Sequence, residues 1–278
     1  MMFPRSISTL LTALALSGCI ATDEPSLENE TRTIAVEQNA TPAGANAAES
    51  VAHLLPATGP TYVTLTVSRV DKFDASKEQD KNKSAITSGS GFIADPSGYV
   101  ITAAHVAHQK DYLVSARAAN GRIYSGKVIA VNPGNDMALI KLRGYAGKAV
   151  TPGDGACLVR GSLVYSLGRP HSQGDTARVG SLESMHFGRA VAYGKFGYPD
   201  AMVVRMSTRK GESGGPLFND NGMLVGMVVS TLSDQTGKSI NLAHAIYGAS
   251  LADFFCSSTT CSDRWAALAR SSPGACEG

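Results

Sequence analysis

The sequence has few aromatic and charged residues, and it lacks the long apolar runs of membrane-spanning proteins. Aromatic side chains make up 6% of the 278 residues and charged side chains 17%, with a single tryptophan. Because no run of 18 or more apolar residues occurs, we expect no membrane-spanning helix in the mature protein. The net charge is only +2 and basic residues do not cluster with aromatic ones, so we expect no nucleic-acid partner.

Cysteine is also scarce and forms no metal-binding pattern. The five cysteines are Cys19, Cys157, Cys256, Cys261 and Cys276. None belongs to a CxxC pair or a Cys/His cluster, so we expect no metal and no other cofactor. Without Cys19, four remain, which suits two disulfides in an oxidising compartment and allows three pairings. We favour Cys256–Cys261 with Cys157–Cys276, and a buried free thiol at Cys157 is the alternative.

The first 18 residues have the pattern of an export signal. Arg5 precedes an apolar stretch, residues 7–16, that is too short to span a bilayer. The stretch ends in Leu16-Ser17-Gly18-Cys19, which resembles a bacterial lipobox, where cleavage precedes a cysteine that becomes lipidated. We therefore predict a lipoprotein signal peptide over residues 1–18 and a lipid anchor on Cys19. The protein would face the periplasm at the inner or the outer membrane; an ordinary secretory signal is the alternative.

Residues 19–57 are predicted to be a flexible tether. From residue 20 onward this stretch contains no aromatic residue, and six acidic residues stand against one arginine. Such a composition buries too little apolar area to offset the entropy lost on ordering. A tether of this length would reach roughly 30–35 Å, so the folded body would stay close to the membrane.

From Thr61 onward the sequence predicts many short strands. Val63, Leu65 and Val67 alternate with polar residues, which is the period-two pattern of a half-buried strand. Further strands are predicted over 86–94, 99–103, 112–116, 122–131, 138–142, 162–168, 178–185, 202–206, 224–230 and 242–246. A charged loop is predicted over residues 71–84, and helical periodicity appears only over 248–255 and 263–270. The pattern predicts an all-β antiparallel barrel or sandwich with a short C-terminal helix.

Three sequence blocks carry the parts of a hydrolytic site. Gly211-Glu212-Ser213-Gly214-Gly215-Pro216 does not suit a helix or a strand interior, so it predicts a tight loop whose backbone N–H groups face a ligand. His105 follows Ala103-Ala104, which suits a crowded strand-to-helix turn, and Asp136 precedes an apolar run. Together the blocks provide a base, a carboxylate and a nucleophile in the order His, Asp, Ser.

In their order and spacing these blocks resemble the trypsin-like serine peptidases, specifically the bacterial HtrA/Deg type. His105 and Asp136 are 31 residues apart, and Asp136 and Ser213 are 77 apart. The resemblance covers roughly residues 60–256 and implies two six-stranded antiparallel β-barrels with the active site between them. About 20 residues remain after Cys256, which leaves no room for the PDZ domains that HtrA/Deg enzymes usually carry. We therefore expect a peptidase domain over 58–256 and a C-terminal helix with a disulfide-tied tail over 257–278.

The resemblance also implies the role of each residue. Ser213 is the expected nucleophile, His105 the general base and then acid, and Asp136 the carboxylate that holds the His105 tautomer. The backbone N–H groups of Gly211 and Ser213 are expected to form the oxyanion hole. No role is assigned to Glu212 at this stage.

Substrate specificity is predicted less sharply. Ser207, six positions before the nucleophile, is expected at the base of the P1 pocket, where an Asp would favour Lys or Arg. Val228, Val229, Ser230 and Thr231 are expected to pair with an extended peptide and to suit small or aliphatic P1 side chains.

Other functions stay open at the sequence level. Residues 211–215 also match the G-x-S-x-G elbow of α/β-hydrolases, but only Asp220 or Asp234 followed by His244 could complete that triad, without crossover helices. We predict a serine endopeptidase that acts on envelope proteins; the alternative is a catalytically silent peptidase fold used as a binding or chaperone module. A processing enzyme for one partner is a third option, and the oligomeric state is not predicted. The remaining histidines are predicted to be surface or satisfied core residues: His53, His108, His171, His186 and His244.

Overall fold

The computed structural model describes residues 32–38, 44, 46–69, 85–153, 158–171 and 174–271. The predictions for the signal peptide, for Cys19, for the 71–84 loop and for the Cys157–Cys276 bridge lie outside these residues. Within the described residues, none of the helices is long and apolar enough to cross a membrane.

The first barrel closes six antiparallel strands in the order β2-β3-β4-β7-β6-β5. These strands are β2 (Tyr62–Ser68), β3 (Ala85–Asp95), β4 (Tyr99–Thr102), β5 (Leu113–Ala118), β6 (Ile123–Asn132) and β7 (Met137–Leu142). The alternation predicted in β2 is confirmed, because Val63, Leu65 and Val67 are buried in the core while Thr66 is exposed.

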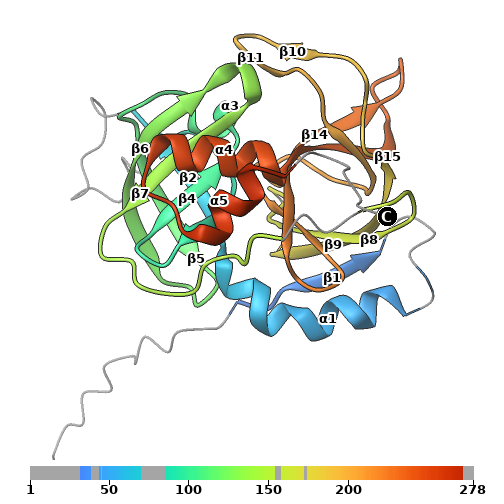
Figure 1. Ribbon diagram of the computed structural model, residues 1–278, viewed down its shortest axis with the longest axis horizontal. Coiled ribbons are helices and arrows are strands. Elements are labelled where there is room, and N and C mark those ends of the chain that lie inside the picture. The colour runs from blue at the N-terminus through green and yellow to red at the C-terminus, as the bar shows by residue number, and fades with distance from the viewer. Residues whose placement is uncertain are drawn as a thin grey trace, which may run out of the picture.

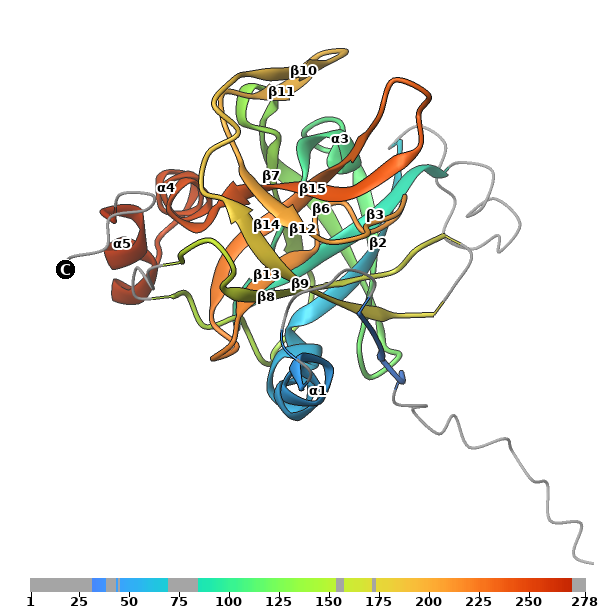
Figure 2. The ribbon, with the colours of Figure 1, turned by 90° about the vertical axis from the view of Figure 1, so that its right-hand side faces the viewer.

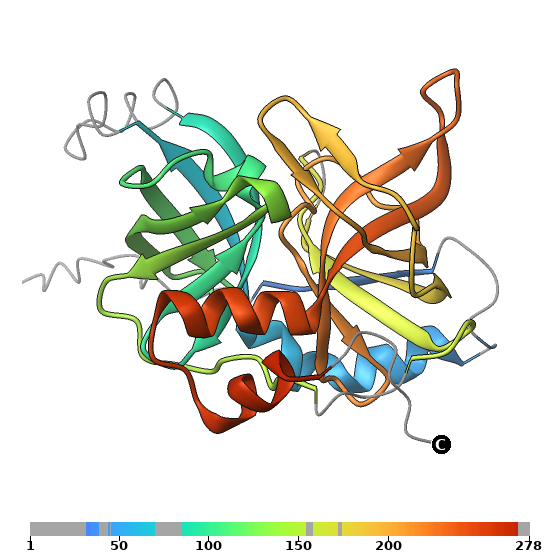
Figure 3. The ribbon, with the colours of Figure 1, turned by 45° about the horizontal axis from the view of Figure 1, so that its top comes forward.

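The second barrel also has six strands, in the order β9-β12-β15-β14-β13-β8, and pairing of β8 with β9 closes it. Its strands are β8 (Leu163–Gly168), β9 (Thr176–Ser184), β12 (Met202–Arg205), β13 (Pro216–Asn219), β14 (Leu224–Ser233) and β15 (Ser239–Tyr247). The short hairpin β10 (Val191–Tyr193) and β11 (Phe196–Tyr198) extends from it. Two six-stranded barrels are therefore confirmed, and Figure 3 shows them side by side.

Two C-terminal helices lie across the barrels (Figure 1). Helix α4 (Gly248–Ser258) is followed by α5 (Asp263–Ala269), close to the predicted ranges. The predicted Cys256–Cys261 disulfide is confirmed and links α4 to the loop before α5, with the Cα atoms 5.0 Å apart. The indole N–H of Trp265 donates to the carbonyl of Ala94 in the first barrel at 2.9 Å, so the C-terminal segment is anchored on the peptidase body.

The predicted tether over 19–57 is wrong where the structure describes it, because this segment folds onto the second barrel. Strand β1 (Ala35–Gln38) pairs in parallel with β9, and α1 (Ala47–Thr58) follows it into the turn η1 (Gly59–Thr61) and β2. Helix α1 buries Ala47, Val51 and Thr58. The lack of aromatic residues does not prevent this folding, because β1 is held by its backbone. Half of one edge of β9 is not paired with β12, and its backbone groups are open to hydrogen bonds from another strand.

Candidate active site

His105 lies in the one-turn helix α3 (Ala104–Ala107), directly after β4. Ala103 and Ala104 are fully buried, which confirms the crowded strand-to-helix turn that the sequence predicted. His105 Nδ1 lies 2.8 Å from Asp136 Oδ2, and the His105 backbone N–H donates to Asp136 Oδ1 at 2.9 Å. A carboxylate only accepts hydrogen bonds, so the ring carries its hydrogen on Nδ1 and leaves Nε2 free as a base.

Asp136 is completely buried and has a left-handed backbone, with φ of 46°, at the end of the turn η3 (Pro133–Asn135). The Asn132 side chain accepts from the backbone N–H of Asn135 at 3.2 Å and fixes this turn. The Asp136 carbonyl accepts from the backbone N–H of Ala104 at 3.1 Å. Side chain and backbone of Asp136 thus both hold the segment that carries His105.

Tyr193 is a member of this site that no sequence pattern indicated. It ends strand β10, in a hairpin that lies at the same end of the molecule as α3 (Figures 1 and 2). Its hydroxyl donates to Asp136 Oδ2, and its ring meets the His105 ring edge-on, with centroids 5.6 Å apart. Burial and the neighbouring Asp136 carboxylate raise the pKa of Tyr193, so the hydroxyl stays protonated and donates. A lone tyrosine at the end of a three-residue strand offers no local signal of such a role.

Ser213 lies in the loop between β12 and β13, and this loop is bound to the segment that leads to His105. The Ser213 carbonyl accepts from the backbone N–H of Ser90 at 2.9 Å. A Cβ atom on Gly214 would come within 2.3 Å of Thr102 Oγ1 and 3.1 Å of the Ala103 nitrogen. The glycine that follows the nucleophile is therefore required for the two barrels to meet at this point.

The Ser213 hydroxyl donates to the carbonyl of Val229 at 3.2 Å. Within the described residues it has no hydrogen bond to His105. Hydrogen bonds between catalytic groups are often formed only when substrate is bound. The serine side chain would rotate about its χ1 angle to face His105 Nε2.

Two unpaired backbone N–H groups lie at Ser213 and two residues before it. Within the described part of the chain, the N–H groups of Gly211 and Ser213 have no hydrogen-bond partner. The Lys210 carbonyl, in the peptide that carries the Gly211 N–H, accepts from the backbone N–H of His171 at 3.2 Å, and the Gly211 carbonyl accepts from Ser90 Oγ at 2.8 Å. Gly211 has φ of +97°, and a Cβ atom there would lie 2.3 Å from the carbonyl oxygen of Arg169. The position therefore requires glycine for both its backbone angle and its close packing.

The residues predicted for substrate binding lie on or beside β14. Val228 and Val229 are buried, and Ser207 is half-buried. The hydroxyl groups of Thr231 and Ser230 are already engaged: Thr231 with Thr208 at 2.6 Å, and Ser230 with the Tyr198 hydroxyl at 2.8 Å.

The histidines outside the candidate site lie at the surface, as predicted, except for His244, a core residue with only one ring nitrogen hydrogen-bonded. His244 is 2% exposed, its Nδ1 lies 2.7 Å from the Tyr198 hydroxyl, and its Nε2 is buried without a partner in the described residues. Burial lowers the pKa of His244 to about 4. His186 is exposed and pairs with Asp200 at 2.7 Å. The others are exposed or half-exposed: His53, His108 and His171.

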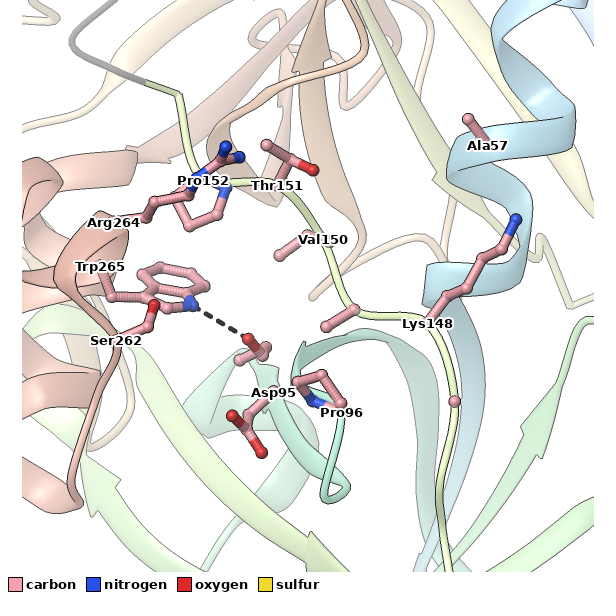
Figure 4. Close-up of a pocket in the computed structure, with 13 residues that line it drawn as sticks. Ala57, Asp95, Pro96, Lys148, Val150, Thr151, Pro152, Ser262, Arg264 and Trp265 are labelled. Atoms are coloured by element: carbon pink, nitrogen blue, oxygen red, sulfur yellow. Dashed lines mark hydrogen bonds between the residues drawn. The ribbon is translucent and has the colours of Figure 1, made fainter.

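A pocket of about 550 Å³ lies where α5 meets the first barrel (Figure 4). Trp265, Asp95, Lys148 and Arg264 are among its lining residues, and none of the catalytic candidates lines it. Among the described residues no three His, Cys, Asp or Glu side chains form a group that could hold a metal ion.

Comparison with known proteins agrees with this geometry. Residues 89–227 match the family model of the trypsin-like peptidase domain. A Brucella suis protein named "Probable periplasmic serine endoprotease DegP-like" is 29% identical over 174 residues, which cover 62% of this chain and 33% of the relative. A Pseudomonas putida protein of the same name is 30% identical over 167 residues, which cover 60% of this chain and 34% of the relative. The chain thus spans about a third of the length of these relatives.

Solved structures share the fold. The HtrA-type protease AlgW with a tripeptide superposes with a TM-score of 0.58 at 23% identity, covering 70% of this chain and 59% of that one. The Rv3671c protease in its inactive form gives a TM-score of 0.60 at 20% identity, covering 81% and 98%. The family model covers half of the chain, across both barrels and from β3 to β14. On this evidence the chain belongs to the trypsin-like peptidases and is homologous to the DegP/HtrA serine proteases.

Proposed function

We propose that this protein is a serine endopeptidase that hydrolyses peptide bonds of cell-envelope proteins through an acyl-enzyme. One observation carries the proposal: a buried Asp136 holds His105 with Nε2 free, beside a Ser213 loop with two unpaired N–H groups. A base, a nucleophile and donors for a developing oxyanion are the parts that acyl transfer requires.

The proposed reaction begins when the Ser213 hydroxyl leaves the Val229 carbonyl and faces His105 Nε2. The oxygen attacks the substrate carbonyl carbon while Nε2 takes the proton, and the N–H groups of Gly211 and Ser213 bind the oxyanion. The imidazolium then protonates the leaving amine and the acyl-enzyme remains. Water repeats these steps, which releases the acid and restores the serine.

Asp136 has two functions in this scheme. Its Oδ2 atom accepts from His105 Nδ1–H, which orients the ring and stabilises the imidazolium. Its complete burial keeps water from competing for that hydrogen bond.

The cellular setting is proposed on two grounds. The relatives named above carry the word periplasmic in their names, and Leu16-Ser17-Gly18-Cys19 resembles a lipobox. We place the protein at the periplasmic side of a membrane, anchored through Cys19. Metabolic labelling with an alkyne fatty acid, compared between the wild type and Cys19→Ala, tests the anchor.

A substrate preference for small or aliphatic P1 side chains is part of the proposal. Its support is the apolar burial of Val228 and Val229 beside the nucleophile loop, and the absence of a carboxylate at Ser207. A peptide-library digest in which basic or acidic P1 residues dominate would contradict it.

Fluorophosphonate labelling tests the peptidase activity directly. The wild type should label once and Ser213→Ala should not label, whereas Ser88→Ala, which removes an exposed serine of β3, should label like the wild type. The wild type and Ser88→Ala should also cleave casein, and Ser213→Ala should not. A folded wild-type protein that binds peptides but neither labels nor cleaves them would instead support the alternative, a catalytically silent binding or chaperone module.

A further inference from the structure

Arg178 of β9 is a charged residue buried in the second barrel. It is 1% exposed and is the largest fully buried side chain in the described residues. Its Nε atom donates to Glu212 Oε1 at 2.7 Å, and its Nη1 atom donates to Glu37 Oε2. Removing a guanidinium from water is unfavourable unless the charge is paired and hydrogen-bonded, as it is here by two carboxylates.

Glu212 connects this arginine to the nucleophile. It lies between Gly211 and Ser213, the residues with the two unpaired N–H groups, and its side chain is 2% exposed. Its second carboxylate oxygen, Oε2, accepts from the backbone N–H of Arg209 at 2.5 Å. One carboxylate therefore joins the start of the loop to β9, and the peptide on the C-terminal side of Glu212 carries the unpaired Ser213 N–H.

The space for this carboxylate is part of the fold. A Cβ atom on Gly168 would lie 2.7 Å from Glu212 Cγ and 2.8 Å from Glu212 Cβ, so β8 has glycine where Glu212 packs. Burial raises the pKa of the Glu212 carboxyl, and Arg178 opposes this by favouring the charged form. Without its partner the side chain would gain by turning out into water, and the loop would turn with it.

Glu37 brings the N-terminal strand into the same cluster. It lies on β1 directly opposite Arg178 in the parallel pairing with β9. Strand β1 fills the half of one β9 edge, residues 176–179, that β12 leaves uncovered. Just before β1, Arg32 pairs with Asp175 and donates to the carbonyl of Arg117 at 3.1 Å in the first barrel. Residues 32–38 thus contact both barrels, and through Glu37 they contact Arg178.

We propose that Arg178, held by Glu37, is a positioning residue that fixes the oxyanion loop through Glu212, so that catalytic competence depends on the docked N-terminal strand. The inference rests on the proposed function. It assigns a role to three residues outside the His105–Asp136–Ser213 set. It also gives the segment before α1 a function in turnover, in addition to any role as a link to the membrane.

The test compares Arg178→Met with a matched control, Arg205→Met, in the full-length protein. Arg205 on the neighbouring strand β12 pairs with Glu183 at 2.6 Å at the barrel surface and does not contact Glu212. Glu37→Gln is the second variant because it is partly exposed and keeps its shape. Peptide turnover gives kcat and KM, and hydrogen exchange reports on residues 207–217.

We expect Arg178→Met to lower kcat by about 10²-fold, the scale of losing one oxyanion donor, with little change in KM. Glu37→Gln should lower kcat less, and Arg205→Met should match the wild type. Exchange should speed up at Gly214 and Gly215, whose N–H groups are bonded to Val228 and Glu212. A merely structural role would instead lower the melting temperature without a selective loss of kcat.

The inference is overturned if folded Arg178→Met and Glu37→Gln keep wild-type kcat and wild-type exchange in the loop. If Arg178→Met does not fold, Glu37→Gln decides by the same criteria. A wild type that neither cleaves nor labels would instead reject the proposed function. In that case the hydrogen-exchange rates of residues 207–217 still decide whether Arg178 positions this loop.

Discussion

The Tyr193 hydroxyl and the His105 ring share one oxygen of Asp136. Tyr193 donates to Oδ2, and His105 Nδ1 lies 2.8 Å from the same atom. The two donors reach Asp136 from different barrels, since His105 follows β4 and Tyr193 ends β10. The carboxylate therefore ties the hairpin of the second barrel to His105 of the first.

Tyr193→Phe should change the pH profile of catalysis. The variant keeps the ring that meets His105 edge-on and removes only the hydroxyl. Asp136 then becomes a stronger acceptor for His105, so the apparent pKa of the acidic limb of kcat/KM should rise. A hydrogen bond to a charged group contributes about 1.5–3 kcal/mol, and we expect kcat to fall by roughly tenfold. Tyr145→Phe, which removes a hydroxyl bonded to Lys148, is the control. An unchanged pH profile in Tyr193→Phe would contradict the prediction.

Gly211→Ala should reduce turnover by about 10²–10³-fold with little effect on KM. The added Cβ atom would lie 2.3 Å from the Arg169 carbonyl oxygen, so the peptide that holds one oxyanion donor has to move. Gly237→Ala is matched in backbone angle, with φ of +81°, but has no atom within 4 Å, so it separates backbone strain from collision. Equal kcat values for the two variants would argue against the assigned donor.

His244→Gln should remove part of the acid sensitivity of the fold. The pKa of His244 is lowered from 6.5 to about 4 by burial, so the unfolded chain binds a proton there more readily than the folded chain. Stability from this group is complete above pH 6.5 and is lost as the pH falls toward 4. Between these values the melting temperature of the wild type should fall by a few degrees more than that of the variant. The exposed His53→Gln should follow the wild type.

Loss of the Cys256–Cys261 disulfide should lower stability without lowering kcat. The bridge closes a loop with a sequence separation of 5, for which the entropy of the unfolded chain predicts about 2 kcal/mol. Urea denaturation of the Cys256→Ser, Cys261→Ser double variant measures this difference, and the reduced wild type should agree with it. A loss of kcat in the folded double variant would show that α4 and α5 act on the site.

The local structure around the candidate residues His105, Asp136 and Ser213 was predictable from sequence, because each residue lies in a recognisable short-range pattern. Two buried alanines before His105, an apolar strand after Asp136 and glycines around Ser213 all reflect short-range constraints on turns and strands. The barrels were predictable for the same reason, and most strands end within a few residues of the predicted positions. The strands β10, β11 and β13, of three or four residues each, were not among the predicted strands.

The partners across the fold were decided only by tertiary structure. Strand β1 and helix α1 lie in a stretch with no aromatic residue, and they are ordered because β9 offers an open edge and the barrel an apolar face. Tyr193 meets Asp136 across 57 positions, and Arg178 meets Glu212 across 34. No local pattern encodes such pairs, since the free energy that fixes them comes from burial and charge between segments that only folding brings together.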